Sequence, residues 1–385
     1  MIEEIVRSVR EQGEPALRRW SEQFGDLEPD APLVRDREEL ERARRALPEE
    51  DRALLERVAQ RIERFARAQR DSLRPIDMAV PGGRAGHEVV PIERAGCYAP
   101  GGRYPLPSSV LMTAVTARVA GVRSIWVASP KPSPVTLAAA AIAGVDGVLA
   151  VGGAQAIAAM AYGVGMPRRD IIVGPGNRYV TAAKQLVSAD VAIDMPAGPS
   201  ELVVLADASA DPRRVAADLL AQAEHDPEAR PILLTESAEL IGRVEAELTA
   251  QLATLPTATV ARAALANGRL ERVEDERELV ARCNEIAPEH LAIHRRRTPS
   301  GLLHYGTRFE GENAAEVFGD YGAGPNHVLP TGGRARMTGG LSVLTFLRVR
   351  TWMRGEERDP DLIRDTARLA RLEGLEAHAR AAEMR

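Results

Sequence analysis

The chain opens with apolar residues that recur at the period of a helix. One stripe is formed by Ile2, Ile5, Val6 and Val9, and a second by Leu54, Val58, Ile62 and Phe65. Spacings of three and four residues bring such side chains onto one face of a helix. Residues 1 to about 75 are therefore predicted to be helical. Residues 78–98 change to short extended pieces around the turn Pro81-Gly82-Gly83.

Between residues 98 and 201, apolar runs of strand length alternate with helical stretches. The predicted strands span residues 125–128, 147–151 and 171–173, and the predicted helices span residues 110–121, 135–143, 154–163 and 178–187. Glycine-rich turns separate strand from helix at residues 152–153 and 174–177. This alternation is typical of a parallel sheet with right-handed crossovers.

A second alternating block begins at residue 202. Its predicted strands span residues 202–206, 232–234 and 270–273, and its predicted helices span residues 212–224 and 237–266. The pattern predicts an α/β fold with two incomplete Rossmann-like doubly wound units and helical N-terminal and C-terminal extensions.

The predicted domain boundaries follow from these two blocks. Residues 98–201 form one unit, and residues 1–97 give a helical start and strands to the other unit, which continues in residues 202–341. Residues 342–385 are highly charged, and their apolar positions are too sparse for an independent core. We expect them to form a helical dimerisation tail.

Composition narrows the class of protein. The net charge is -5 with acids and bases mixed along the chain, so no basic face is offered to nucleic acid, and no apolar run reaches the length of a membrane span. The first residues resemble an amphipathic helix rather than a signal peptide, so a cytoplasmic protein is expected. The two cysteines, Cys97 and Cys283, lack zinc or redox spacing. The only lysines are Lys131 and Lys184, which leaves little room for Schiff-base chemistry.

The first candidate for chemistry is the adjacent pair Glu289 and His290. Pro288 disfavours helix at Ala287, so the pair should lie on a turn that enters a strand. A histidine titrates near neutrality, and a glutamate in a dry site can approach the same range, so the two side chains can act as proton acceptors. The alternative is a helix end and a strand start without a chemical role.

Two further groups could carry chemistry. Gln222 and His225 are three residues apart at the end of a predicted helix, on the stripe that should face inward. They can ligate a metal or merely cap the helix. Asp320 and His327 lie seven residues apart in a glycine-rich loop, which can serve binding or can be a simple turn.

The dinucleotide fingerprint G-x-G-x-x-G is missing. The glycines at 152–153 and 174–176 nevertheless lie between a predicted strand and a helix, where backbone amides could receive phosphate. Among the remaining histidines, His294 precedes an arginine run and is predicted to be at the surface. His87 and His304 lack partners in the sequence, and His378 in the charged tail is expected to be solvated.

Taken together, the residues resemble the histidinol dehydrogenase family over nearly the whole chain. The matching segments, in order, are Tyr98-Ala-Pro-Gly-Gly, Pro107-Ser-Ser-Val-Leu-Met, Val151-Gly-Gly-Ala-Gln-Ala-Ile-Ala, Val173-Gly-Pro-Gly-Asn-Arg-Tyr-Val, Ile193-Asp-Met-Pro-Ala-Gly-Pro-Ser-Glu, Asp218-Leu-Leu-Ala-Gln-Ala-Glu-His-Asp, Ala287-Pro-Glu-His-Leu, Gly319-Asp-Tyr and Gly324-Pro-Asn-His-Val-Leu-Pro-Thr. The resemblance implies a homodimeric zinc enzyme that oxidises L-histidinol to L-histidine through L-histidinal with two NAD, the last step of histidine biosynthesis.

The resemblance also implies a role for each matching residue. Glu289 and His290 match the catalytic proton acceptors. The implied zinc ligands are Gln222, His225, Asp320 and, from the partner subunit, His378. The implied substrate contacts are Ser200, Glu373 and His290 together with the four metal ligands, and the implied dinucleotide contacts are Tyr98, Gln155 and Asn177. The loop at Arg103-Tyr104 varies within the family, and NAD is expected rather than NADP.

Three other functions remain open at this stage. A related zinc- and NAD-dependent dehydrogenase would act on another small alcohol and keep Glu289 and His290. A zinc hydrolase would use Glu289 on a metal-bound water and need no nucleotide. A non-catalytic dimeric scaffold would need neither metal nor turnover.

Overall fold

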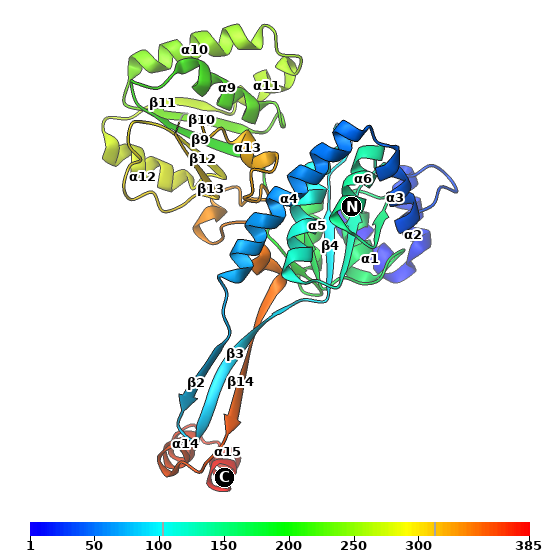
Figure 1. The fold of residues 1–385 in the computed structure, drawn as a ribbon, viewed down its shortest axis with the longest axis vertical. Coiled ribbons are helices and arrows are strands. Elements are labelled where there is room, and N and C mark those ends of the chain that lie inside the picture. The colour runs from blue at the N-terminus through cyan, green and yellow to red at the C-terminus, as the bar shows by residue number, and fades with distance from the viewer. Residues whose placement is uncertain (102–103, 312) are drawn as a thin grey trace.

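The computed structural model describes residues 1–101, 104–311 and 313–385. They form two α/β lobes, from which a long three-stranded antiparallel sheet projects (Figure 1). Each lobe contains one mainly parallel sheet with helices on both faces, so the predicted α/β class with parallel sheets is confirmed.

The first lobe is built on a six-stranded sheet in the order β1-β6-β5-β4-β7-β8. Its strands are β1 (Val34–Asp36), β4 (Arg94–Tyr98), β5 (Ser124–Ala128), β6 (Gly147–Leu149), β7 (Ile171–Val173) and β8 (Ala192–Ile193). Only β1 is antiparallel to its neighbour. One face is covered by α3 (Arg37–Ala46), α4 (Glu49–Asp71), α5 (Pro107–Ala120) and α6 (Pro134–Ala143), and the other by α1 (Ile2–Gln12), α2 (Glu14–Gln23), α7 (Gly153–Tyr162) and α8 (Arg178–Val187).

The second lobe has a five-stranded parallel sheet in the order β11-β10-β9-β12-β13. Its strands are β9 (Glu201–Ala206), β10 (Arg230–Thr235), β11 (Arg269–Arg272), β12 (His290–His294) and β13 (Thr307–Glu310), and its helices are α9 (Pro212–Ala223), α10 (Ala238–Leu252), α11 (Ala258–Leu265), α12 (Glu276–Ile286) and the short α13 (Val317–Asp320). Every residue of β9 is buried, as a central strand covered on both faces requires.

The parallel strands of both sheets follow one order. Numbered within each lobe, they run 3-2-1-4-5, which matches five strands of the doubly wound order 3-2-1-4-5-6. In such sheets the strand order reverses beside the first strand, here between β4 and β7 in the first lobe and between β9 and β12 in the second. Ligands of open α/β sheets usually bind at the carboxyl ends of the strands at this point.

The predicted domain boundary is wrong for the N-terminal part. Strands β1 and β4 belong to residues 1–97 or overlap them, but they pair with β6, β5 and β7 and not with the sheet of residues 202–341. Helices α1 to α4 likewise pack on the first lobe. The error has a physical cause. The pairing of β1 with β6 joins residues more than a hundred positions apart, and the local hydrophobic pattern does not indicate which distant strand a segment pairs with.

The third sheet forms a stalk, which we define as β2 (Ile76–Val80), β3 (Gly83–Pro91) and β14 (Leu347–Gly355). A short helix η1 (Arg334–Arg336) and a second, η2 (Val343–Phe346), precede β14, and α14 (Pro360–Leu372) and α15 (Glu376–Glu383) lie at the tip of the stalk (Figure 1). The segment 342–385 was predicted to be helical, and this is wrong for its first part, since β14 pairs with β3 as an antiparallel strand over nine residues.

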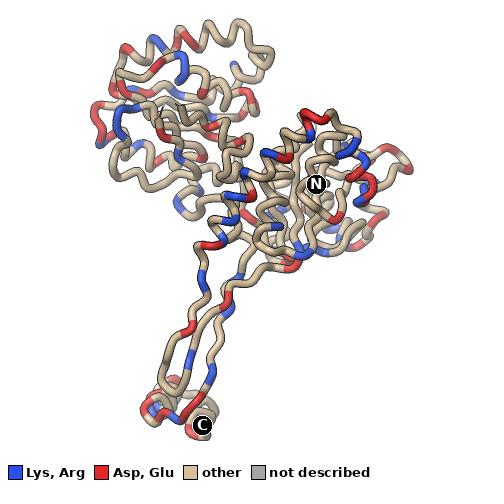
Figure 2. The backbone as a smooth tube through the Cα atoms, in the orientation of Figure 1, with Lys and Arg blue, Asp and Glu red and all other residues tan. Residues whose placement is uncertain are grey.

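Charged residues of both signs are interspersed over the lobes and the stalk (Figure 2). Among the described residues, no helix combines the length and the apolar character that crossing a membrane requires.

The stalk depends on a glycine at its centre. A Cβ at Gly86 would stand 2.0 Å from the carbonyl oxygen of Ile76 on β2. Gly86→Ala is therefore expected to separate β2 from β3 and to destabilise the stalk by roughly 1–3 kcal/mol, the usual range for overpacking. Faster hydrogen exchange of the β2 and β3 amides would show this. Gly355→Ala is the control, because a Cβ there meets nothing within 4 Å, and equal exchange in the two variants would contradict the prediction.

Candidate active site

Glu289 and His290 lie at the amino end of β12. Helix α12 ends at Ile286, and Ala287 turns the chain with a left-handed φ of 50°. Pro288 follows, and β12 begins at His290, which pairs with Leu202 of β9. The predicted turn into a strand is confirmed. Both side chains are buried, with exposures of 6% for Glu289 and 5% for His290.

The backbone of β9 holds the Glu289 carboxylate. Its Oε2 accepts a hydrogen bond of 2.9 Å from the Glu201 N–H, and this bond and the neighbouring Ser200 side chain act to lower the pKa of the carboxyl group. Burial raises the pKa of Glu289 well above its usual value, and the negative charges of Asp320 and Glu201 act in the same direction. The carboxyl group is therefore poised to accept and release a proton at a higher pH than an exposed glutamate.

His290 is a neutral imidazole at pH 7. Burial lowers its pKa to about 4, and the neighbouring His225 and His327 act in the same direction, although Asp320 opposes them. Its Nδ1 lies 3.9 Å from Glu289 Oε2 and has no hydrogen-bond partner among the described residues. A buried imidazole with a free nitrogen can take a proton from a substrate hydroxyl.

Asp320 lies at the centre of a group of imidazoles. Its carboxylate stands 3.5 Å from Nε2 of His225, 3.9 Å from Nε2 of His290 and 3.9 Å from Nδ1 of His327. Burial would raise the pKa of Asp320, but the hydrogen bond to His225 and the nearby imidazoles hold it below its usual value. The same bond raises the pKa of His225. The prediction did not assign a role to His327, although it lay in the glycine-rich loop that the sequence had indicated.

Gln222 has an unusual environment for a side-chain amide. It lies in the last turn of α9, is only 2% exposed, and its Nε2 has no hydrogen-bond partner among the described residues. A buried amide without a partner is costly, and rotation of the amide exchanges its nitrogen and oxygen. The next turn brings His225, 44% exposed, against Asp320. An amide oxygen, an imidazole nitrogen and a carboxylate are the donor types of a site for zinc.

No cluster of three His, Cys, Asp or Glu side chains with the spacing of a metal site occurs in residues 1–101, 104–311 and 313–385. In the predicted ligand set, a single chain brings together only two residues of these types, His225 and Asp320. Gln222 lies one turn before His225. The unpartnered amide of Gln222 and the donor chemistry of the three residues fit a zinc ion that needs a further ligand.

The site lies where the two lobes meet. The loop after α13 rests on helices of the first lobe, because Arg61 of α4 donates to the Gly322 carbonyl at 2.8 Å and Asn326 donates to the Met112 carbonyl of α5 at 2.8 Å. Ser109 of α5 lies 3.5 Å from Nε2 of His327. Residues of the first lobe can therefore reach a molecule bound at Asp320.

The predicted dinucleotide contacts gather at the carboxyl edge of the first sheet. Tyr98 ends β4, Gln155 lies in the first turn of α7 after β6, and Asn177 caps α8 after β7. The Tyr98 hydroxyl accepts the Gly153 N–H at 3.1 Å, and burial raises its pKa to about 12, so it stays protonated. Asn177 is exposed at this edge. This is the place where the strand order reverses and where ligands usually bind.

Three of the backbone amides that the sequence offered to phosphate, those of Gly152, Gly153 and Gly174, are already bonded within the protein. The Gly152 N–H and the Nε2 of Gln155 both donate to Oδ2 of Asp26, at 3.0 and 2.9 Å, and the Gly174 N–H donates to Asp194 at 2.8 Å. The sequence analysis missed Asp26, which lies 129 positions before Gln155 and carries no local signal. Arg103, named for the cofactor loop, lies outside the described residues.

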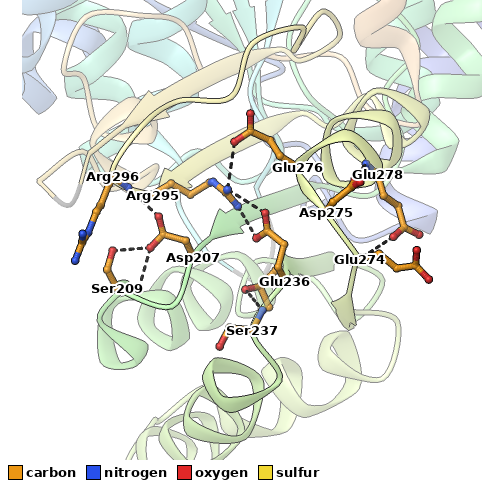
Figure 3. Close-up of polar contacts among 11 residues, drawn as sticks. Asp207, Ser209, Glu236, Ser237, Glu274, Asp275, Glu276, Glu278, Arg295 and Arg296 are labelled. Carbon is orange, nitrogen blue, oxygen red and sulfur yellow. Dashed lines mark hydrogen bonds and ion pairs between the residues drawn. The ribbon is translucent and has the colours of Figure 1, made fainter.

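The corresponding edge of the second sheet is filled by ion pairs (Figure 3). The Arg295 guanidinium, only 9% exposed, contacts Glu236 at 2.7 and 3.0 Å and Glu276 at 3.5 Å. Asp207 accepts hydrogen bonds from Ser209. The usual ligand edge of this lobe is thus occupied by its own side chains, and the candidate chemistry stands at the opposite, amino edge.

Two predicted residues stand apart from this group. Glu373 follows the last residue of α14 and His378 lies in α15, both exposed at the tip of the stalk, while α9 and α13, which carry Gln222 and Asp320, lie in the second lobe away from that tip (Figure 1). The single chain does not bring them together. His294 was predicted at the surface, and this is wrong, because it is 5% exposed and bonds to Asp218 at 2.7 Å.

Comparison with known proteins agrees with this geometry. The family model for histidinol dehydrogenase matches residues 1–385. A histidinol dehydrogenase of Thermus thermophilus is 49% identical over 100% of this chain and 94% of its own length, and one of Parasynechococcus marenigrum is 44% identical over 100% and 90%. The crystal structure of histidinol dehydrogenase from Elizabethkingia anophelis superposes with a TM-score of 0.94 at 33% identity, over 100% of this chain and 90% of that one.

A more distant likeness concerns the fold alone. An acetylating aldehyde dehydrogenase from Geobacillus thermoglucosidasius is 13% identical, with a TM-score of 0.53 over 93% of this chain and 97% of that one. The match of the family model to every residue and the near relatives of almost equal length decide the assignment: this chain belongs to the histidinol dehydrogenase family, oxidoreductases of histidine biosynthesis.

Proposed function

We propose that this chain oxidises L-histidinol to L-histidine through L-histidinal, with zinc bound and with two NAD consumed in succession. The single observation that carries the proposal is His290, a neutral and buried imidazole whose Nε2 points toward Asp320 and whose Nδ1 is unpartnered. A neutral imidazole at this place is a base for the hydroxyl of an alcohol.

The binding of substrate and metal is assigned to the interlobe group. Gln222, His225 and Asp320 would hold zinc, with His378 of the partner subunit as the further ligand. When bound, zinc supplies open positions that fix the substrate imidazole and amino nitrogen. Ser200 and Glu373 would contact the substrate, with Glu373 also coming from the partner.

In the first oxidation, His290 would accept the hydroxyl proton of the substrate. NAD, held by Tyr98, Gln155 and Asn177 at the edge of the first sheet, would supply the hydride acceptor for the alcohol carbon. In the second half, Glu289 takes a proton from the water that adds to the aldehyde, and its raised pKa suits that task. His290, after releasing its first proton to solvent, would accept a proton from the hydrate, and a second NAD would supply the hydride acceptor.

The stalk supports a dimer with shared sites. Its exposed faces carry large apolar side chains that a monomer leaves uncovered, among them Met78, Val349 and Met353, with exposures of 56%, 63% and 64%. Apolar surface of this kind on a projecting sheet is suited to a second copy of the chain. In that arrangement, the α14 and α15 tip of one chain would reach the site of the other.

The first experiment measures NADH formed from L-histidinol by protein loaded with zinc. About two NADH per histidinol are expected, because oxidation of an alcohol to an acid releases two hydrides. Chelation should abolish the reaction, and zinc should restore it. A hydrolase would need no nucleotide, and a dehydrogenase for another alcohol would reduce NAD with that alcohol alone. Absence of NADH from folded, zinc-loaded protein would refute the proposal.

The second experiment asks whether the site is shared. His378→Ala and Glu289→Gln proteins are co-refolded, and each is refolded alone as the control. If His378 acts across the interface, each hybrid dimer has one intact site, so about a quarter of all sites should recover with random pairing. Recovery no greater than in the separately refolded controls would place His378 in its own chain and contradict the shared site.

The third experiment uses stability and requires no turnover. Between the unfolded-state pKa of Glu289, near its usual 4.5, and its raised pKa in the fold, the native state binds more protons, so stability falls as pH rises. The Glu289→Gln protein has no carboxyl group at this position, so its stability does not fall with pH for this reason. In metal-free protein it should be more stable than the parent at pH 7, with the difference shrinking toward pH 4. Denaturant unfolding measures this, and Glu274→Gln, an exposed carboxylate, is the control. A parent that is the more stable at pH 7 would contradict the prediction.

A further inference from the structure

Residues 194–200, which we call the interlobe segment, connect the last strand of the first sheet to β9 of the second. The segment begins beside the turn that carries Asn177 and ends beside the carboxylate of Glu289. It has no regular secondary structure. Its position is nevertheless fixed by side chains from both lobes.

A buried ion pair anchors the beginning of the segment. Asp194 contacts the Lys184 ammonium, and both side chains are only 2% exposed. The pair encloses Gly174, because Asp194 accepts the Gly174 N–H at 2.8 Å and Lys184 donates to the Gly174 carbonyl at 3.0 Å. Gly174 has a φ of +118°, and a Cβ there would stand 2.1 Å from the Tyr98 carbonyl oxygen. The ion pair thus fixes the turn that adjoins Tyr98 and leads to Asn177.

Two threonines anchor the middle of the segment, one from each lobe. Thr181 of α8 donates its hydroxyl to the Ala197 carbonyl at 2.8 Å. Thr331, which follows the glycine-rich loop of the second lobe, accepts the Gly198 N–H at 2.5 Å. Consecutive residues of the segment are therefore bonded to opposite lobes.

The end of the segment is anchored at the catalytic carboxylate. The N–H of Glu201, the residue directly after Ser200, donates to Glu289 Oε2 at 2.9 Å. The Glu201 carboxylate accepts hydrogen bonds from Arg230 at 2.9 Å and from the Gly332 N–H at 3.2 Å. Displacement of the segment would therefore move Glu289 relative to the nucleotide edge of the first lobe.

We infer that the interlobe segment sets the distance between nucleotide and substrate, and that Thr181, Lys184 and Asp194 are positioning residues for hydride transfer. The inference rests on the proposed function, in which the first lobe holds the nucleotide and the second holds the substrate. Hydride transfer requires the reacting atoms to be about 3–3.5 Å apart, and a misplacement of ~1 Å can cost roughly a hundredfold in rate. A loosened segment should thus lower the rate of the chemical step while each molecule still binds to its own lobe.

The test variant is Thr181→Val, which keeps the shape of the side chain, removes one hydrogen bond and leaves no buried charge unpaired. We expect kcat for histidinol oxidation to fall about tenfold, within the range that misplacement produces. The half-saturating concentrations of NAD and of histidinol should stay within about twofold of the parent values, since neither binding edge is altered. With histidinol deuterated at the alcohol carbon, the isotope effect on NADH formation should rise, and Thr181→Ser should restore the parent values.

Thr249→Val is the matched control, because Thr249 donates a similar bond of 2.9 Å to the Glu245 carbonyl within exposed α10. A Thr181→Val protein with the kcat and isotope effect of the parent would overturn the inference. A loss of NAD affinity in proportion to the loss of kcat would also overturn it, since the substitution would then have damaged the nucleotide-binding edge instead of changing the distance between nucleotide and substrate. The double variant Lys184→Met with Asp194→Asn, which carries no buried charge, should also lower kcat and raise the isotope effect.

Hydrogen exchange separates this inference from the proposed function. Amides of residues 194–201 should exchange faster in Thr181→Val than in the parent or in Thr249→Val, whatever the substrate of the enzyme. Unchanged exchange would overturn the inference even if the parent oxidises histidinol. Faster exchange in a protein whose parent does not oxidise histidinol would instead refute the proposed function and leave the anchoring role of the segment in place.

Discussion

The proposed chemistry depends on the burial of Glu289 and His290 away from water. Burial acts on the two side chains in opposite directions, because it disfavours the charged form of each: the pKa of the glutamate rises and that of the histidine falls. The pairing of β9 with β12 imposes this burial, since it places His290 opposite Leu202 and brings the Glu201 N–H to the carboxylate. The register of β9 against β12 therefore gives both a neutral histidine and a glutamate of raised pKa.

The two lobes have the same strand order but use opposite edges. In the first lobe, the carboxyl edge presents Tyr98 and Asn177 where the strand order reverses, as doubly wound sheets usually do. In the second, Arg295 and its partner carboxylates fill that edge (Figure 3), and Glu289 and His290 stand at the amino edge. That amino edge adjoins Asp320 and the loop that α4 and α5 hold, so it faces the first lobe.

The sequence predicts the elements better than their assembly. Apolar runs such as that of β9 predict buried parallel strands, and Pro288 correctly predicts the turn before β12. The pairing of β1 with β6 carries no such signal, because register between distant segments is decided by packing. The same limit explains His294, whose arginine-rich neighbourhood suggests the surface while Asp218, 76 positions away, holds it inside.

For the candidate site too, the sequence indicates single residues better than the contacts between them. Motif spacing indicates Gln222 and His225 as a pair and indicates the loop of Asp320, but only the fold brings His225 to the carboxylate. Asp26 could not have been found from spacing, since its role depends on bonds to Gly152 and to a glutamine 129 positions away. Long-range polar contacts of this kind produce no periodic pattern in the sequence.

The stalk is the part of the structure that a single chain explains least. Three narrow strands bury little apolar surface, and a small sheet of this kind is marginal without a packing partner. Its outer positions nevertheless carry Ile76, Met78 and Met353 with exposures of 47%, 56% and 64%, which a solvated ribbon does not require. A second copy that covered these side chains would stabilise the stalk and at the same time direct the tip toward a site in another chain. The stability of the stalk and the completion of the active site would then have the same physical cause.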